Sequence, residues 1–179
     1  MVYFFIAEGF EEIEALCPLD LLRRVGIEVK TVGVGAREIV GAHGIKVTTD
    51  MLDSEYSDSA PELVFLPGGM PGTLNLAKSD VVASAISDAY KNGSYIAAIC
   101  AAPMILGQMG LLCGREAICY PGFEDKLAGA TISKDRVVAD GKILTAAGMG
   151  VALEFGLLII SILKGKDVAD DLRRAIIAD

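Results

Sequence analysis

A cysteine occupies the centre of an almost unbroken apolar segment, SYIAAICAAPMIL, which runs from Ser94 to Leu106. The part before Cys100 is typical of a buried strand, and Pro103 stands where the first turn of a helix would begin. A sharp strand-to-helix turn would place the thiol beside a helix N-terminus, which favours the thiolate and lowers the thiol pKa. Cys100 is therefore a candidate nucleophile, and the alternative is a cysteine that fills the core.

An acidic side chain on the first predicted helix is the second candidate. Glu14 shares a helix face with Cys17 and Leu21 and is expected to point inward. Glu11 and Glu12 are expected to face solvent, and Ile13 is expected to lie on the buried side of the same helix. A carboxyl group in an apolar pocket has a raised pKa and can donate a hydrogen bond to a neighbouring thiolate. The alternative is a carboxylate at the edge of the first turn that simply complements the helix dipole.

A glycine pair ends another apolar segment, ELVFLPGG, which runs from Glu62 to Gly69. Glycines after a strand let backbone N–H groups point into a pocket, where such groups stabilise an oxyanion. The N–H groups of Gly69 and of Ala101, the residue after the cysteine, are the candidate donors. The sequence LPGGMPG is equally typical of a tight turn, and it matches neither a P-loop nor GxGxxG.

The other cysteines and the single histidine give a weaker signal. His43 lies in a predicted turn, so no Cys-His hydrolase pair is expected, but His43 remains a candidate pocket residue, contributed by this chain or by a second subunit. Cys17, Cys113 and Cys119 are expected to be small buried side chains, with Cys17 nearest the site. Because the chain has one histidine and no CxxC pair, we expect no metal site.

Charge and composition exclude several classes of function. The 179-residue chain has 24 acidic and 16 basic residues, a net charge of −8, which disfavours nucleic acid and membrane partners. The N-terminus lacks the basic region of a signal peptide, and free thiols fit a reducing compartment, so we expect a cytoplasmic protein. With 53% hydrophobic residues and no Trp, the core must be built mainly from aliphatic side chains, as in α/β proteins.

Alternating strands and helices must position these candidates. Strands are predicted at 2–7, 26–34, 62–66, 94–99, 117–120, 137–140 and 143–145; helices at 12–25, 80–91, 101–109, 150–163 and 168–177; and a hairpin at 39–49. This alternation predicts a single α/β domain over residues 1–179, with a doubly wound, mostly parallel sheet and helices on both faces. In such sheets ligands bind beyond the carboxyl ends of the strands, where Cys100 and the glycine pair would lie.

With these features assembled, the chain resembles the ThiJ/PfpI superfamily, and within it the branch of the Parkinsonism-associated protein deglycase and bacterial ThiJ-like proteins. The resemblance covers nearly the whole chain. It rests on several motifs in one order: AEGFEEIEA (7–15), LLRRVGIEV (21–29), LVFLPGGMPG (63–72), YIAAICAAP (95–103), YPGFEDKL (120–127) and ILTAAGMGVALEFGLLII (143–160).

The resemblance implies a flavodoxin-like fold of the class I glutamine amidotransferase-like type, a homodimer and cofactor-free chemistry. Cys100 would be the reactive cysteine, Glu14 the protonated glutamate that holds it, and Gly69 a backbone donor to the same site. The implied substrates are small 2-oxoaldehydes such as methylglyoxal, or glycated proteins and metabolites. Tyr120 stands where some members carry a pocket histidine, so it is expected to line the pocket.

Three other functions remain to be weighed against this glyoxalase or deglycase reading. A redox sensor or holdase chaperone needs the same activated thiol, oxidised to sulfenate and sulfinate, and the sequence does not separate it from the enzyme. A peptidase is disfavoured because Ala101 follows the cysteine, where the peptidase branch of the superfamily has a histidine. A role in thiamine-precursor metabolism has no residue here to support it.

Overall fold

The computed structural model describes residues 1–178, and its centre is a seven-stranded sheet with the order β10-β11-β7-β6-β1-β2-β5. Neighbouring strands run parallel, except for the antiparallel pair β10 and β11 at one edge. The predicted doubly wound, mostly parallel sheet is thus confirmed. Its strands are β1 (Val2–Ile6), β2 (Val29–Gly33), β5 (Met51–Leu52), β6 (Leu63–Leu66), β7 (Tyr95–Ile99), β10 (Val137–Asp140) and β11 (Ile143–Ala146).

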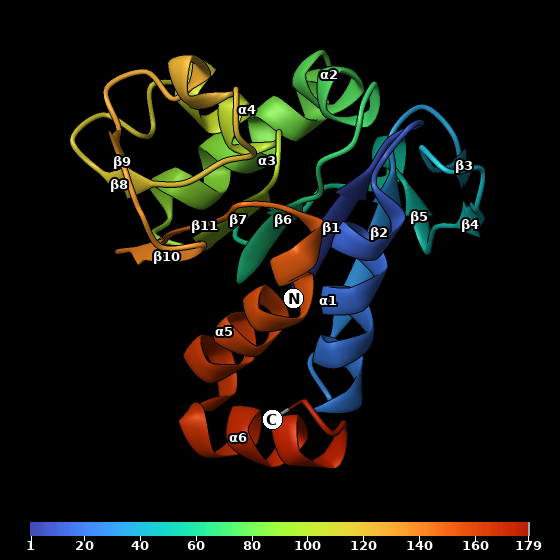
Figure 1. Ribbon diagram of the computed structural model, residues 1–179. Helices are drawn as coiled ribbons and strands as arrows, with labels where there is room; N and C mark the ends of the chain where they lie inside the picture. Colours follow the sequence, from blue (N-terminus) through green and yellow to red (C-terminus); the bar gives the residue numbers. More distant parts are fainter. Residues whose placement is uncertain (179) are drawn as a thin grey trace.

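Helices cover both faces of this sheet (Figure 1). On one face lie α1 (Glu12–Arg24), α5 (Ala152–Lys164) and α6 (Lys166–Ala175), and on the other lie α2 (Gly72–Ala77), α3 (Asp80–Lys91) and α4 (Pro103–Gln108). Short 3-10 helices occur at η1 (Asp53–Glu55), η2 (Glu124–Lys126) and η3 (Met149–Val151). Within residues 1–178, every helix is too short or too polar to span a bilayer.

Alternate residues of the central strands supply the two halves of the core. In β1, Tyr3 and Phe5 face α2, α3 and α4, whereas Val2 and Phe4 face α1, α5 and α6. The Phe4 ring stacks on Phe65 of β6, with centroids 4.1 Å apart and planes 6° apart. Because both faces are buried, these strands are continuously apolar, which explains why the sequence signals them so clearly.

The carboxyl ends of β1, β6 and β7 meet at one edge because these strands are neighbours in the sheet. The chain leaves β1 toward β2 and returns on the opposite side of β1 as β6, so the strand order reverses there. Such a reversal opens a crevice for ligands. The three sequence features singled out above, the start of α1, the glycine turn and Cys100, all follow these strand ends.

Some elements differ from the predictions. Helix α2 forms directly after the glycine turn, where the Gly and Pro residues predict only loop. The predicted strand at 117–120 is reduced to β8 (Glu116–Ala117), which pairs with β9 (Thr131–Ile132). The strand is short because the N–H of Tyr120 donates to the carbonyl of Cys100, which turns the segment toward β7. The predicted hairpin at 39–49 forms as β3 (Glu38–Val40) and β4 (Lys46–Thr48).

Side-chain exposure corrects three predictions. Ile13, expected on the buried face of α1, is 49% exposed, and Glu12, expected to face solvent, is 3% exposed. The β3–β4 hairpin covers the side of α1 on which Glu12 lies, which accounts for its burial. Cys113, expected to be buried, is exposed on the surface.

Candidate active site

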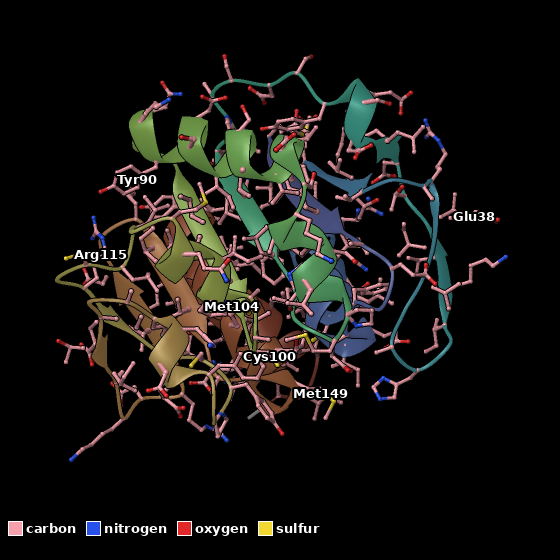
Figure 2. All side chains as sticks on the ribbon, turned by 90° about the horizontal axis from the view of Figure 1, so that it is seen from above. Glu38, Tyr90, Cys100, Met104, Arg115 and Met149 are labelled. Atoms are coloured by element: carbon pink, nitrogen blue, oxygen red, sulfur yellow. The ribbon has the colours of Figure 1, made fainter. Side chains whose placement is uncertain are left out.

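Cys100 adopts a backbone conformation that non-glycine residues rarely use. It follows β7 directly and has a φ of 65°, which costs an ordinary residue roughly 1–2 kcal/mol. Two hydrogen bonds hold its backbone there: its N–H donates to Ala146 over 2.9 Å, and its carbonyl accepts from Tyr120 over 2.8 Å. Strain maintained by neighbouring segments is typical of functional sites. The turn places the partly exposed thiol at the carboxyl edge of the sheet, close to Met149 in Figure 2.

Glu14 lies in the first turn of α1 and is almost completely buried, with 1% of its surface exposed. Its carboxylate accepts a hydrogen bond from the backbone N–H of Gly68 over 3.0 Å. The Cys100 side chain and the backbone of Met149 are also close enough to the carboxyl group to lower its pKa. Burial raises the pKa of Glu14 to about 7, and the charge of Glu11 adds to this effect, whereas its hydrogen bonds act in the opposite direction. The carboxyl group is thus held against the sulfur and can carry a proton near neutral pH.

The electrostatics of the thiol differ from the sequence-based expectation. Burial and then the negative charge of Glu14 raise the pKa of Cys100 to about 12, although the N–H groups of Ala101 and Gly69 lower it. The N-terminus of α4 does little to lower the pKa of Cys100, because Pro103 has no N–H and the N–H of Met104 is bonded to the carbonyl of Ala101. A thiolate therefore forms most readily when Glu14 keeps its proton, since one buried charge is favoured over two.

The glycine turn brings the backbone closer to these side chains than any other residue would allow. A Cβ at Gly68 would lie 2.5 Å from Oε2 of Glu14 and 2.7 Å from Cβ of Cys100. Gly69 has a φ of +90°, and a Cβ there would lie 2.3 Å from the backbone nitrogen of Glu11. Gly68 thus serves the carboxylate and Gly69 the sulfur, each through its backbone N–H.

A small cavity opens in front of the thiol. It has a volume of about 180 Å³ and is lined by Gly69, Met70, Cys100, Ala101, Tyr120 and Phe123. A second hollow of about 290 Å³, lined by Tyr120, Pro121, Arg136 and 147–151, shares the Tyr120 ring with the first. The cavity at the sulfur suits a molecule of a few heavy atoms, and Tyr120 borders both spaces.

His43 and Cys17 lie elsewhere in this chain. The side chain of His43 is 68% exposed and contacts Glu11 and Glu12, so it does not line the cavity at Cys100 in the described part of the chain. Cys17 is one helical turn from Glu14 but lines a different hollow with Leu21, Leu153 and other residues of α1, α5 and α6. Burial raises the pKa of Cys17, so it is a poor nucleophile.

Sequence reasoning missed two contributors to this site. The backbone of Met149, at the start of η3, lies near Glu14 and lowers its pKa, and Phe123 lines the cavity. The glycines on either side of Met149 are a signal that could have found the first, because they predict a turn in which backbone groups are accessible. Phe123 carries no comparable signal, since one aromatic residue in a loop has many uses.

Comparison with known proteins identifies the family of this chain. The sequence profile described as "DJ-1/PfpI family" matches residues 1–162. The chain belongs to the DJ-1/PfpI family. Protein DJ-1 homolog B of Arabidopsis thaliana is 41% identical over 167 residues, which are 92% of this chain and 38% of that longer protein. The chain thus spans less than half of this plant relative.

Two further family members match over most of their own length. The glutathione-independent glyoxalase DJR-1.2 of Caenorhabditis elegans is 30% identical over 167 residues, covering 92% of this chain and 89% of that protein. The structure of oxidised Toxoplasma gondii DJ-1 has a TM-score of 0.94 and 32% identity, covering 98% of this chain and 97% of that one. These similarities establish the family and the flavodoxin-like fold.

Proposed function

We propose that this protein converts 2-oxoaldehydes such as methylglyoxal into 2-hydroxy acids without a cofactor, with Cys100 as nucleophile and Glu14 as proton carrier. The observation that carries the proposal is the contact between the buried carboxyl group of Glu14 and the Cys100 thiol, which itself lines a small cavity. Similarity to a relative named as a glutathione-independent glyoxalase supports it.

The first step forms a bond between sulfur and the aldehyde carbon. The Cys100 thiolate adds to the carbonyl, and the aldehyde oxygen takes up the proton of Glu14, which gives a neutral hemithioacetal and a carboxylate. The N–H groups of Gly69 and Ala101 point toward the sulfur, so they are close enough to stabilise the alkoxide that develops on the neighbouring carbon.

The second step moves hydrogen within the substrate. The Glu14 carboxylate removes the proton from the former aldehyde carbon and passes it to the ketone oxygen, which gives an enediol. It then takes the proton of the former aldehyde oxygen and passes it to the former ketone carbon. The aldehyde carbon is thereby oxidised to a thioester while the ketone carbon is reduced to an alcohol, so no external oxidant or reductant is needed. Water then hydrolyses the thioester, which releases the 2-hydroxy acid and restores the thiol and the protonated carboxyl group.

Methylglyoxal consumption with lactate detection tests this proposal, in the absence of glutathione. We expect turnover by the wild type, its loss in Cys100→Ser, and a fall of at least about a hundredfold in Glu14→Gln, which preserves the shape of the side chain but cannot exchange a proton. Lactate formation by Cys100→Ser at the wild-type rate would contradict the proposal. Glycated thiols and amines that release the same aldehydes are a second substrate class for the same assay.

A second candidate function uses the same thiol as a redox sensor. Its support is the accessible sulfur of Cys100 beside the N–H groups of Gly69 and Ala101, which can bind the oxygens of a sulfinate, together with similarity to a DJ-1 whose structure is of an oxidised form. Peroxide titration with peptide mapping tests it, because the expected product is a two-oxygen adduct on Cys100. Oxidation that falls equally on exposed Cys113 would remove this support.

We also propose that the chain forms a homodimer through the exposed end of α1 and the start of α5. Ile13 is 49% and Leu153 is 38% exposed, so each presents a large aliphatic side chain that a second subunit would cover. Light scattering of the wild type and of Ile13→Glu measures the mass directly. We expect a dimer that dissociates in the variant, and a monomeric wild type would exclude the proposal.

A further inference from the structure

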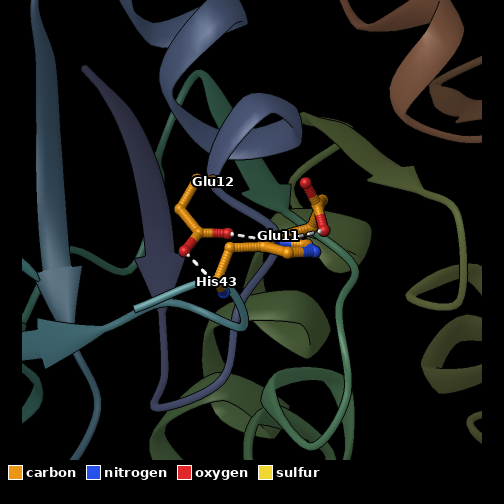
Figure 3. A group of neighbouring side chains, drawn as sticks. All are labelled: Glu11, Glu12 and His43. Carbon is orange, nitrogen blue, oxygen red and sulfur yellow. Dashed lines mark hydrogen bonds and ion pairs between the residues drawn. The ribbon is translucent and has the colours of Figure 1, made fainter. Parts of the chain in front are cut away.

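Two acidic residues and the single histidine meet beside the start of α1, outside the cavity at Cys100 (Figure 3). Glu11 immediately precedes α1, Glu12 begins it, and His43 lies in the turn between β3 and β4. Nδ1 of His43 is 3.0 Å from Oε2 of Glu12 and 3.4 Å from Oε2 of Glu11. One donor atom from each residue lies within 4.8 Å of the others. The fold therefore brings the nitrogen donor of His43 to two oxygen donors from adjacent residues in a distant part of the sequence.

The two oxygens of Glu12 have different surroundings. Oε1 accepts hydrogen bonds from the backbone N–H groups of His43, at 2.8 Å, and of Ile45, at 3.3 Å. Oε2 contacts the imidazole. The backbone of the hairpin thus fixes the orientation of the carboxylate and leaves one oxygen directed at Nδ1. Outer hydrogen bonds of this kind orient the ligands in metal sites.

Charge around this group is strongly negative. The side chain of Glu12 is 4% exposed and that of Glu11 is 15% exposed, and among residues 1–178 their ion pairs are with His43, not with a lysine or an arginine. Buried carboxylates are normally paired with a cation or bound to a metal. The positive end of α1 compensates part of this charge, but its half charge is smaller than the two carboxylate charges.

We propose that Glu11, Glu12 and His43 form a binding site for a divalent transition-metal ion, with Zn²⁺ as the ion to test. The ion would take the place of the Nδ1 proton, which is released to solvent, and would bind Nδ1, Oε2 of Glu12 and one oxygen of Glu11. One nitrogen and two oxygens, with water at the remaining positions, suit Zn²⁺ and its neighbours. The imidazole is 68% exposed, so the ion can reach the site from solvent.

This site is distinct from the thiol, and the proposal does not depend on the proposed function. Cys100 and Glu14 are also possible Zn²⁺ ligands, because a thiolate and a carboxylate both bind this ion. A test must therefore separate the two locations. The single histidine makes that possible, because the imidazole signals in a proton–nitrogen correlation spectrum belong to one residue.

The test titrates ZnCl₂ into the full chain and follows the imidazole nitrogens of His43 by NMR, with calorimetry in parallel. We expect a saturable change in the Nδ1 signal and one binding event in the wild type and also in Cys100→Ser. His43→Gln and Glu11→Gln should each weaken binding at least about tenfold. Glu8→Gln is the matched control, because Glu8 is an exposed neighbour that bonds to Val40 and lies outside the donor group. It should bind as the wild type does.

Two results would overturn the proposal. One is Zn²⁺ binding that disappears in Cys100→Ser but is unchanged in His43→Gln, since the ion would then occupy the thiol site. The other is an Nδ1 signal that does not saturate, which marks weak attraction to a negative surface. Circular dichroism and the thermal midpoint of each variant verify that it is folded. Glu11→Gln differs little in shape from the wild type, because glutamine retains an amide oxygen in place of the carboxylate. His43→Gln changes a side chain that is 68% exposed and therefore disturbs little packing.

Discussion

Gly68 donates its backbone N–H to Oε2 of Glu14 over 3.0 Å, at a separation where a side chain on residue 68 would meet that same oxygen. A loop that follows β6 thus positions a carboxyl group on α1, and the distance between them depends on the absence of a Cβ. The relationship joins two elements far apart in sequence at the point where the proposed proton transfer takes place.

Gly68→Ala tests this relationship. The added Cβ would lie 2.5 Å from Oε2 of Glu14 and 2.7 Å from Cβ of Cys100, so one of these groups must move. We expect the free energy of unfolding to fall by about 1–3 kcal/mol and kcat/KM for methylglyoxal to fall by about a hundredfold. Gly150→Ala is the control, because a Cβ there meets no atom within 4 Å. Wild-type kinetics for Gly68→Ala would show that the close approach is not needed.

The Tyr120 ring is predicted to limit the size of the substrate. It lines both the cavity of about 180 Å³ at Cys100 and the neighbouring hollow of about 290 Å³. Tyr120→Ala should join the two spaces and improve kcat/KM for phenylglyoxal relative to methylglyoxal, by roughly tenfold for an aromatic ring that gains a pocket. Tyr120→Phe is the matched control and should retain the wild-type ratio. Equal ratios in all three proteins would exclude a steric role for this ring.

Asp50 gives a prediction for the pH dependence of stability. Its Oδ2 accepts from the N–H of Thr31 at 2.8 Å, the hydroxyl of Thr31 at 2.9 Å and Nη2 of Arg23 at 2.7 Å. Partial burial alone would raise the pKa of Asp50, but these hydrogen bonds and the Arg23 charge outweigh burial and lower it. A lowered folded-state pKa adds stability that is present above the unfolded-state pKa, about 4, and is lost as the pH falls through the folded-state value.

We therefore expect Asp50→Asn to lower the free energy of unfolding by about 1–2 kcal/mol at pH 7, an effect reduced by solvent screening because the Asp50 side chain is 41% exposed. The difference from wild type should shrink as the pH falls below about 4. Urea unfolding at pH 7, 4 and 3 measures it. Asp20→Asn removes the exposed pair with Arg24 and should change stability by less than about 0.5 kcal/mol. A constant difference at all three pH values would refute the assignment.

Thiol labelling should distinguish the cysteines outside the site. Cys113 is exposed, whereas Cys119 is 1% exposed, and burial raises the pKa of Cys119 to about 11. In Cys100→Ser, a disulfide reagent at pH 8 should modify Cys113 in the native state and Cys119 after unfolding in urea. Peptide mapping identifies the labelled residues. Rapid native labelling of Cys119 would mean that the segment before Tyr120 opens readily.

The sequence predicted the features that follow from local pattern. Apolar strands such as VYFFI and YIAAI have one interpretation in a chain of this composition, and the Asp80–Lys91 helix has the predicted bounds because Ser79 caps its start and Asn92-Gly93 follows its end. The position of Cys100 directly after a strand was predicted from the apolar pattern of YIAAI. The pKa of its thiol was not, because it depends on the charge of Glu14 and on which N–H groups near Pro103 are already bonded.

Contacts between distant segments account for the remaining differences. Glu12 was expected to face solvent because the inward face of the helix was assigned to Glu14 and Cys17. It is buried because the β3–β4 turn lies across it. The pattern of apolar and polar residues along α1 does not indicate where that turn packs. The same turn carries His43 away from the thiol, so the role of this histidine could be assigned only after the hairpin had been placed.

The hydrogen bonds that hold Cys100 in its left-handed conformation involve its main chain and leave its side chain unconstrained by them. The turn therefore does not depend on sulfur: serine, alanine or selenocysteine at this position would inherit the same orientation. The backbone conformation at residue 100 is therefore independent of the side-chain atom at the γ position. A single substitution at residue 100 would change the reactive group and leave the surrounding backbone unchanged.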